Sequence, residues 1–272
     1  MEREEILKKI ESKYQDLGIP VDTMLEGLLY SKPMVYWDYI QADALLGLQT
    51  QRTTLPDEMI FIMYHQVNEL LFKMILLEIK QIAKSDSLDV EVFTKHLKRI
   101  SRYFDMLSSS FDIMGDGMDK EQYMKFRNTL APASGFQSAQ YRMIEFGSTE
   151  LINLIDVRFR STIDRDTPFE HAYEHLYWQA AGKNYNTGQK SILLDKFEKK
   201  YMGDFIDFMK DYNTTNISMK FKSLPESVRN NIDLVNAMRH YDYTVNVKWV
   251  MSHYKAAAKY IGGGAATGGS DW

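Results

Sequence analysis

The sequence contains no cysteine among its 272 residues. This absence excludes disulfide bonds, thiolate metal sites and cysteine nucleophiles, and it fits a reducing compartment. A protein-bound metal must therefore be held by histidine, aspartate or glutamate side chains. Proline is also scarce, with six residues in the chain, so helices can run long without interruption.

The chain also lacks an excess of basic residues, since its formal net charge is −4. A nucleic-acid partner is therefore not expected. The N-terminal stretch MEREEILKKIESKY is charged and periodic, unlike a signal peptide, and no uninterrupted apolar run reaches the length of a membrane span. We expect no membrane association and a cytoplasmic location.

Apolar residues recur at helical spacing, and the alternation typical of half-buried strands is hard to find. The sequence therefore predicts an all-α fold, a helical bundle. Its central helix is predicted from an N-cap at Thr54 to about Lys84, with apolar residues around almost its whole circumference. Further helices are predicted over residues 3–17, 89–113, 119–130, 136–159, 168–182, 190–212, 225–238 and 241–261. No linker marks a boundary, so residues 1–272 are expected to form a single domain.

Two histidines lie in apolar helical surroundings. His65 occurs in FIMYHQVNELLFK, where a histidine is more often a satisfied core residue than a ligand. Burial nevertheless disfavours the charged imidazolium, and a neutral ring could bind a metal or a substrate. His253 follows Trp249 by one helical turn, and the alanines after it leave space for a flat group such as haem. Those alanines could equally permit close helix packing, which the spacing alone favours.

The remaining histidines are weaker candidates. His171 and His175 are one turn apart and could share a metal, but no third ligand is identifiable, so they indicate a surface or a subunit contact. His96 and His240 stand beside basic residues and are predicted to be solvated.

Arg127 and Tyr123 are predicted to share one helix face just before a Pro-Ala-Ser-Gly turn. The planar guanidinium suits a carboxylate ligand, although pairing with any acidic residue of the chain is the ordinary alternative. The glycine-rich end, IGGGAATGGS, lacks the lysine of a phosphate-binding loop. It predicts either a flexible tail or a lid that carries Thr267.

Five segments together resemble the tryptophan 2,3-dioxygenase family, and they occur in that family's order. They are YWDYIQADALLGLQ (36–49), DEMIFIMYHQVNELLFK (57–73), FRNTLAPASGFQSAQYR (126–142), the Trp249-to-His253 spacing, and ATGGS (266–270). The resemblance implies an all-α protein with haem b (iron protoporphyrin IX) that forms a homo-oligomer, usually a tetramer. Its members use O₂ to cleave the indole C2–C3 bond of L-tryptophan, giving N-formylkynurenine in the kynurenine pathway. A related haem enzyme that acts on a different indole, or inserts one oxygen atom, is the alternative.

The resemblance also implies roles for individual residues on the two sides of the haem. His253 matches the axial ligand of the iron, with Trp249 beside the ring. Ser134 and Gly135 match the turn nearest the haem and the substrate. His65 matches the catalytic histidine of the opposite side, where it orients the indole N–H.

The substrate itself is implied to bind between several segments. Arg127 matches the residue that binds the substrate carboxylate. The other substrate-binding positions that the resemblance implies are Phe61, Tyr123, Thr267 and, from the N-terminal segment of a neighbouring subunit, Tyr36, Tyr39 and Ile40. Residues 1–50 are accordingly expected to contact that neighbouring subunit.

Overall fold

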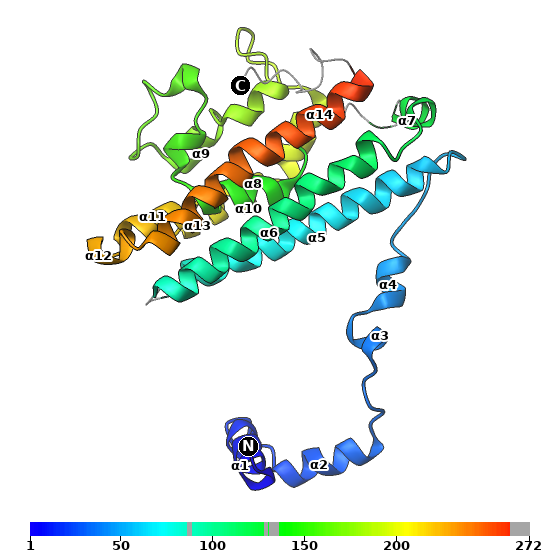
Figure 1. Cartoon of the computed structure of the whole chain (residues 1–272), viewed down its shortest axis with the longest axis vertical. Coiled ribbons are helices and arrows are strands. Elements are labelled where there is room, and N and C mark those ends of the chain that lie inside the picture. The colour runs from blue at the N-terminus through cyan, green and yellow to red at the C-terminus, as the bar shows by residue number, and fades with distance from the viewer. Residues whose placement is uncertain (86–88, 128–129, 131–135, 262–272) are drawn as a thin grey trace. The chain divides into compact units, whose positions relative to one another are not determined.

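The computed structural model describes residues 1–85, 89–127, 130 and 136–261 (Figure 1). The chain divides into two compact units, Met1–Gln49 and Thr50–Trp272. The described residues form helices and contain no β-strand, only two isolated bridges. The predicted all-α class is therefore confirmed, whereas a single domain over residues 1–272 stays a prediction.

The first unit consists of four helices without a core of their own. They are α1 (Arg3–Gln15), α2 (Val21–Tyr30), α3 (Tyr36–Tyr39) and α4 (Ala42–Leu46). None of the residues in this unit is buried, although several are large and apolar. Helix α1 agrees with the predicted helix over residues 3–17, and α2 was not predicted.

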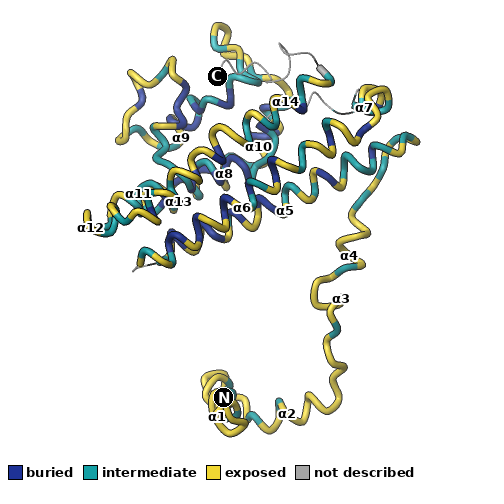
Figure 2. Tube along the Cα trace, in the orientation of Figure 1, coloured by how far each residue is buried: buried dark blue, intermediate teal, exposed yellow. Residues whose placement is uncertain are grey.

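The second unit is built on two long helices, α5 (Asp57–Lys84) and α6 (Val90–Gly115), which lie side by side in Figure 1. Each contributes one apolar face to a common core, and those faces appear as the buried stretches in Figure 2. The fully buried side chains at this contact are Ile75, Ile79, Ile82, Phe93, Leu97, Ile100 and Phe104. Burial of this many large side chains makes the α5–α6 pair the scaffold of the unit.

Helix α5 begins at Asp57, and Thr54 does not cap it. Its N-cap is Pro56, which has no side-chain oxygen to accept hydrogen bonds from the N–H groups of the first turn. The Glu58 carboxylate instead accepts hydrogen bonds from the backbone N–H groups of Arg52 and Thr53 and from the Thr53 hydroxyl. The Thr53 hydroxyl bond holds the pKa of Glu58 below its ordinary value. The start of the helix is thus fixed by Glu58 and Thr53.

By length and composition alone, α5 could cross a membrane, which the sequence pattern did not indicate. One face of the helix, however, packs on α6 and on α8 (Ala139–Ser148). The approach of α8 is close: a Cβ added at Gly147 would lie 2.7 Å from the Ile79 Cγ2 atom. A central helix of a water-soluble bundle has this composition too.

Two predicted helices are shorter than expected. The helix predicted over residues 136–159 ends at Ser148, where Thr149 adopts an extended backbone, and the helix over 168–182 is divided in two. The segments that follow α8 are η1 (Leu151–Leu154), η2 (Val157–Phe159), α9 (Phe169–Tyr173), η3 (Tyr177–Ala181), α10 (Ile192–Tyr212), α11 (Ile217–Ser223) and α12 (Glu226–Arg229), of which η1 to η3 are 3₁₀ helices. Many of their aromatic side chains form a second core around Phe205.

The last helical stretch is continuous where a break was expected near residue 240. Helix α13 (Ile232–Tyr243) passes through a π-helical segment, η4 (Thr244–Trp249), into α14 (Val250–Ile261). Figure 1 shows α13 and α14 running along α6, in agreement with their contacts. This stretch brings the C-terminal part of the chain onto the α5–α6 pair.

The prediction that His96 is solvated is wrong. Its side chain is 6% exposed, and its Nδ1 lies 2.5 Å from Oε2 of Glu78, a residue that is also buried. The Arg99 guanidinium donates to the other carboxylate oxygen at 3.3 Å. His240 is exposed, as expected, and lies 3.9 Å from the Asp105 carboxylate.

Candidate functional site

Three of the predicted site residues meet at the N-terminal half of α5. The rings of Phe61 and His65, one turn apart, have centroids 4.1 Å from each other. Tyr123, on α7 (Lys120–Arg127), lies 6.2 Å from Phe61, and the buried Phe126 lies 5.4 Å from Phe61. An aromatic wall from two helices therefore adjoins the His65 imidazole.

The hydrogen bond of His65 defines its tautomer. Its Nδ1 is 2.8 Å from the carbonyl oxygen of Phe61, which can only accept. Nδ1 must therefore carry the proton, and the neutral ring keeps Nε2 as an acceptor. The surrounding protein lowers the pKa of His65, although part of the ring stays accessible to solvent. The residue can thus accept a hydrogen bond from a ligand near neutral pH.

His253 lies on α14 against aromatic rings. The Trp249 ring stacks nearly parallel to it, at 9° and 5.9 Å between centroids, and Phe111 of α6 is 5.4 Å away. Burial lowers the pKa of His253, and the nearby His65 lowers it further. Among the described residues the His253 ring has no hydrogen-bond partner. A neutral imidazole with free nitrogen lone-pair capacity is what a haem iron requires of an axial ligand.

The π-helical segment η4 ends at Trp249, immediately before α14. Such a segment widens the backbone turn locally, and π-turns inside α-helices often occur at functional sites. Trp249 also stacks on Tyr141 of α8, at 4.7 Å and 25°. The segment therefore orients the ring that contacts His253.

The two histidines come from opposite ends of the unit's sequence and approach each other in space. Tyr64 lies 5.1 Å from the His65 ring and 6.4 Å from Phe111, which contacts His253. The electrostatic effect of His65 on the pKa of His253 requires the same proximity. The structure thus brings together the two imidazoles that the sequence singled out.

Arg127 is the last residue of α7, one turn after Tyr123. Its positive charge lowers the pKa of Tyr123, which burial raises overall, so the guanidinium lies near that phenol. Tyr123 also contacts Tyr260 of α14, with ring centroids 4.7 Å apart. The Tyr260 hydroxyl donates to the backbone carbonyl oxygens of Met114 and Met118. Tyr260 therefore ties the His253 helix to the helix of Tyr123 and Arg127, a link that helical spacing alone did not reveal.

The alanines after His253 are used in part for close packing. Ala256 is buried, and its Cα would lie 3.8 Å from a Cβ added at Gly115 of α6. The alternative raised by the sequence, close approach of helices, therefore holds at Ala256. The His253 ring, one turn before Ala256, does not take part in this close approach and packs against Trp249 and Phe111.

The structure does not test the placement of the remaining predicted site residues. Ser134, Gly135 and Thr267 lie outside the described residues. Tyr36, Tyr39 and Ile40 belong to the first unit, where their side chains are exposed. Their roles stay predictions.

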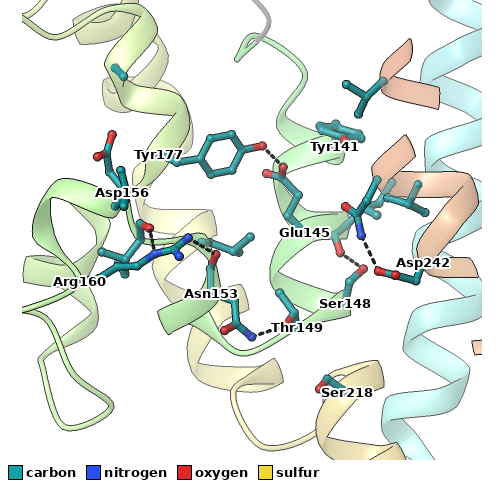
Figure 3. A pocket seen from close by; sticks show the side chains of 18 of the residues that line it. Tyr141, Glu145, Ser148, Thr149, Asn153, Asp156, Arg160, Tyr177, Ser218 and Asp242 are labelled. Atoms are coloured by element: carbon teal, nitrogen blue, oxygen red, sulfur yellow. Dashed lines mark hydrogen bonds between the residues drawn. The ribbon is translucent and has the colours of Figure 1, made fainter. Parts of the chain in front are cut away.

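A pocket of ≈ 1230 Å³ opens elsewhere in the second unit and contains none of the predicted site residues (Figure 3). At its wall, the largely buried Glu145 carboxylate, 12% exposed, accepts a hydrogen bond from the Tyr177 hydroxyl, and Arg142 lies 2.9 Å from the same carboxylate. Burial raises the pKa of Glu145, although both partners oppose this. Asp156 is paired with Arg158 at 2.6 Å. Because these charges are neutralised within the protein, the pocket is a weaker candidate for chemistry than the histidine site.

His171 and His175 form no metal centre with their described neighbours. Their rings are 4.9 Å apart, and the His175 Nδ1 donates to the His171 carbonyl oxygen. Within the described ranges, no group of three His, Asp or Glu side chains is placed to hold a metal ion. The interpretation of this pair as surface residues remains the better one.

Comparison with known proteins gives a consistent result. Residues 27–178 match the profile of the family described as tryptophan 2,3-dioxygenase. The chain is similar to the tryptophan 2,3-dioxygenase of Ruegeria sp. (strain TM1040), with 41% identity over 43% of this chain and 42% of that protein. It is similar to the Bacillus thuringiensis (strain Al Hakam) enzyme of that name, with 36% identity over 52% of this chain and 48% of that protein. The matched segment thus spans less than half of each of these relatives.

Proposed function

The chain belongs to the tryptophan 2,3-dioxygenase family, since the match covers more than half of its length, and from this premise we propose its function. The protein binds haem b and uses O₂ to cleave the C2–C3 bond of the indole ring of L-tryptophan. Both oxygen atoms enter the substrate, one at each carbon of the broken bond, so the product is N-formylkynurenine and no other reductant is consumed.

The observation that carries the proposal is the meeting of His65 and His253. His65 lies within the residues matched to the family, whereas His253 lies 75 residues beyond the last matched position, residue 178. The fold nevertheless brings the second imidazole close enough for the first to lower its pKa. The similarity and the geometry are thus two separate arguments for one site.

The residues present fit a haem. His253 would bind the iron, because its ring is neutral and has no other partner among the described residues. Trp249, one turn earlier in the same helical stretch, and Phe111 of the neighbouring α6 would support the His253 imidazole. The bound ferrous haem would supply the binding and activation of O₂.

On the other side, His65 would orient the substrate. With its Nδ1 proton donated to Phe61, His65 offers Nε2 to the indole N–H. Since the indole N–H is a very weak acid, His65 serves here as a hydrogen-bond acceptor that positions the ring. Phe61 and Tyr123 would cover the apolar faces of the indole.

Arg127 would bind the carboxylate of the amino acid. It ends α7 next to Tyr123, so a carboxylate paired with it lies one helical turn from the aromatic wall. A guanidinium binds a carboxylate through two parallel hydrogen bonds, which fixes direction as well as distance. Ser134 and Gly135 would form the turn nearest the haem and the substrate, and Thr267 would belong to the loop that closes over the amino-acid end of the substrate.

The proposal includes a homo-oligomer, a tetramer in the cytoplasm. Tyr36, Tyr39 and Ile40 of one subunit would reach the substrate site of a neighbour. Their side chains are exposed within a unit that has no buried residue, and large apolar side chains in such a unit favour contact with another surface.

The test is the mass of the product formed from L-tryptophan under ¹⁸O₂. The proposal predicts a gain of two labelled atoms by the wild-type protein and by a His171→Gln control. His253→Gln should form no product, because it loses the ligand of the iron. A gain of one atom, or turnover only of indoles that lack a carboxylate, would assign the chain to a different reaction.

A further inference from the structure

The indole of Trp249 is oriented by ring contacts. Its N–H group is buried and has no hydrogen-bond partner among the described residues. Phe72, Phe104 and Phe111 form T-shaped or tilted contacts with it, at 72°, 81° and 52°. Tyr141, in contrast, stacks on it at 25°, with 4.7 Å between the ring centroids. The three phenylalanines fix where the indole lies, whereas the stacked tyrosine also restricts the tilt of its plane.

The plane of the His253 imidazole follows the plane of Trp249. The two rings are only 9° from parallel, and within the described part of the chain His253 makes no hydrogen bond. A histidine that binds a metal usually donates its second ring N–H to a fixed acceptor, which sets the orientation of the ring. At His253, stacking on Trp249 takes the place of that hydrogen bond.

Tyr141 has a buried cation beside its ring. The guanidinium carbon of Arg142 lies 4.6 Å from the centroid of Tyr141, and the two residues are 4% and 8% exposed, respectively. The attraction between a cation and an aromatic ring is strongest where both are removed from water. This contact therefore favours one orientation of the Tyr141 ring.

Arg142 is itself fixed by two partners. Its Nη1 lies 2.9 Å from the Glu145 carboxylate and donates to the Tyr177 hydroxyl at 3.1 Å. That hydroxyl donates to the same carboxylate, as Figure 3 shows. Apolar replacement of a buried ion pair is often neutral or stabilising, so the stability of the fold does not by itself require this pair. The three mutual contacts do give the guanidinium a single position.

We propose that Arg142 is a positioning residue for His253 and acts through Tyr141 and Trp249. We name these four residues the His253 column. The inference rests on the proposed function, in which His253 binds the haem iron. The column fixes the plane of the imidazole and so the direction of its nitrogen lone pair. Because the outer contacts of a ligand histidine tune how tightly the metal group is held, the column contributes to haem retention.

The competing explanation is that Phe72, Phe104 and Phe111 hold Trp249 without help from the column. Tyr141→Leu separates the two explanations, because it removes the stacked ring and leaves the three phenylalanines in place. Tyr141→Phe is its conservative counterpart, since it keeps the ring and loses only the hydroxyl.

Two further variants test Arg142. Arg142→Met/Glu145→Met removes both members of the ion pair, so no unpaired charge stays buried and the protein should fold. Tyr241→Phe is the matched control: it removes a buried hydrogen bond of 2.6 Å to Ser148 on α8 and keeps the column intact. The far-ultraviolet circular dichroism of all four variants should match that of the wild type.

The first measurement uses the full-length haem-free protein. The NMR resonances of the His253 ring protons are identified by their absence from His253→Gln and are recorded at a fixed pH above the titration range of histidine. Trp249→Leu defines the shift caused by full loss of the indole. Tyr141→Leu and the Arg142→Met/Glu145→Met variant should shift these resonances in the same direction, because the indole tilts away from parallel. Tyr141→Phe and Tyr241→Phe should leave them in place.

The second measurement uses the ferrous haem protein. The Fe–His stretching band of the resonance Raman spectrum reports the bond that His253 forms. Tyr141→Leu and Arg142→Met/Glu145→Met should shift or broaden this band and raise the dissociation constant of haem by about 10- to 100-fold. Tyr141→Phe and Tyr241→Phe should keep the wild-type band and affinity.

The proposal is overturned if Tyr141→Leu leaves the His253 resonances and the Fe–His band unchanged, because the phenylalanines would then suffice. It is also overturned if the Arg142→Met/Glu145→Met variant behaves as the wild type, or if Tyr241→Phe has an equal effect, since loosening of α8 would explain the latter. A wild-type protein that binds no haem contradicts the proposed function. The resonances of the haem-free protein still decide whether the column positions His253.

Discussion

Replacement of Glu78 by alanine is expected to be among the most damaging single changes to the stability of this protein. The Glu78 carboxylate joins α5 to α6 through His96, at 2.5 Å, with both side chains buried. Removal of the carboxylate leaves a buried imidazole without the partner it has in the native protein. Loss of one member of a buried polar pair typically costs about 3–5 kcal/mol, because the remaining group stays desolvated.

The surrounding residues allow this magnitude to be checked. Arg99 also contacts Glu78, at 3.3 Å, but its side chain is 46% exposed, so Arg99→Ala should cost less than about 1 kcal/mol. For a protein of this size, about 3 kcal/mol corresponds to a drop in Tm of about 6–12 °C. Urea unfolding followed by circular dichroism gives the free energies of unfolding of both variants. The double variant Glu78→Leu/His96→Leu removes both polar groups and should recover most of the loss.

The reasoning would be refuted if Arg99→Ala destabilised the protein as much as Glu78→Ala. It would also fail if the apolar double variant were less stable than Glu78→Ala alone. Either result would mean that burial of the Glu78–His96 pair does not determine its contribution to the free energy of unfolding.

Three further predictions concern the histidine site. Arg127→Met should raise the KM for L-tryptophan by about 30-fold or more, because truncation of one partner of a buried charge pair typically costs about 2–5 kcal/mol of binding free energy. The haem spectrum without substrate should stay unchanged. The pKa of His65 is lowered in the folded protein, so the neutral ring contributes to stability above pH 6.5, and this contribution is lost as the pH falls through the lower folded-state pKa. The free energy of unfolding of the haem-free protein should therefore fall between pH 7 and pH 5. In His65→Gln this fall should be smaller. Tyr260→Phe keeps the ring against Tyr123 but loses the hydrogen bonds of the hydroxyl to Met114 and Met118, so kcat should fall by a smaller factor than KM rises. Tyr260→Ala also removes the ring and should raise KM further. Equal effects of the two Tyr260 variants on KM would show that the ring does not position Tyr123.

Residue patterns predicted the long helices well and their interruptions poorly. Helix α5 was recognisable because apolar residues cover most of its surface, and α10 because its periodicity is regular. The break after Ser148 was missed, since an extended Thr149 followed by a 3₁₀ turn leaves the apolar spacing nearly helical. The π-helical segment η4 was missed for the same reason: one widened turn changes the direction of Trp249 without a marker residue.

The candidate site could be predicted in part, and tertiary contacts supply the rest. The basic neighbours of His96, Lys95 and Lys98, indicated solvation, but they point away from the α5 contact that buries it. Phe111 carried no signal of its own, because a phenylalanine on an apolar helix face is ordinary core. It is nevertheless the ring that lies between Tyr64 and His253. Such contacts join residues far apart in the chain, which periodicity within one helix cannot reveal.

The central claim is that His65 and His253 enclose one haem site, and the absorption spectrum of the reduced protein tests it most directly. Protein expressed with ample haem supply should bind haem, and its ferrous spectrum should shift on addition of L-tryptophan. His253→Gln should lose the haem, whereas His65→Gln should keep the haem and show a weaker response to tryptophan. A colourless wild-type protein, or a His253→Gln protein that retains its haem with an unchanged spectrum, would contradict the account.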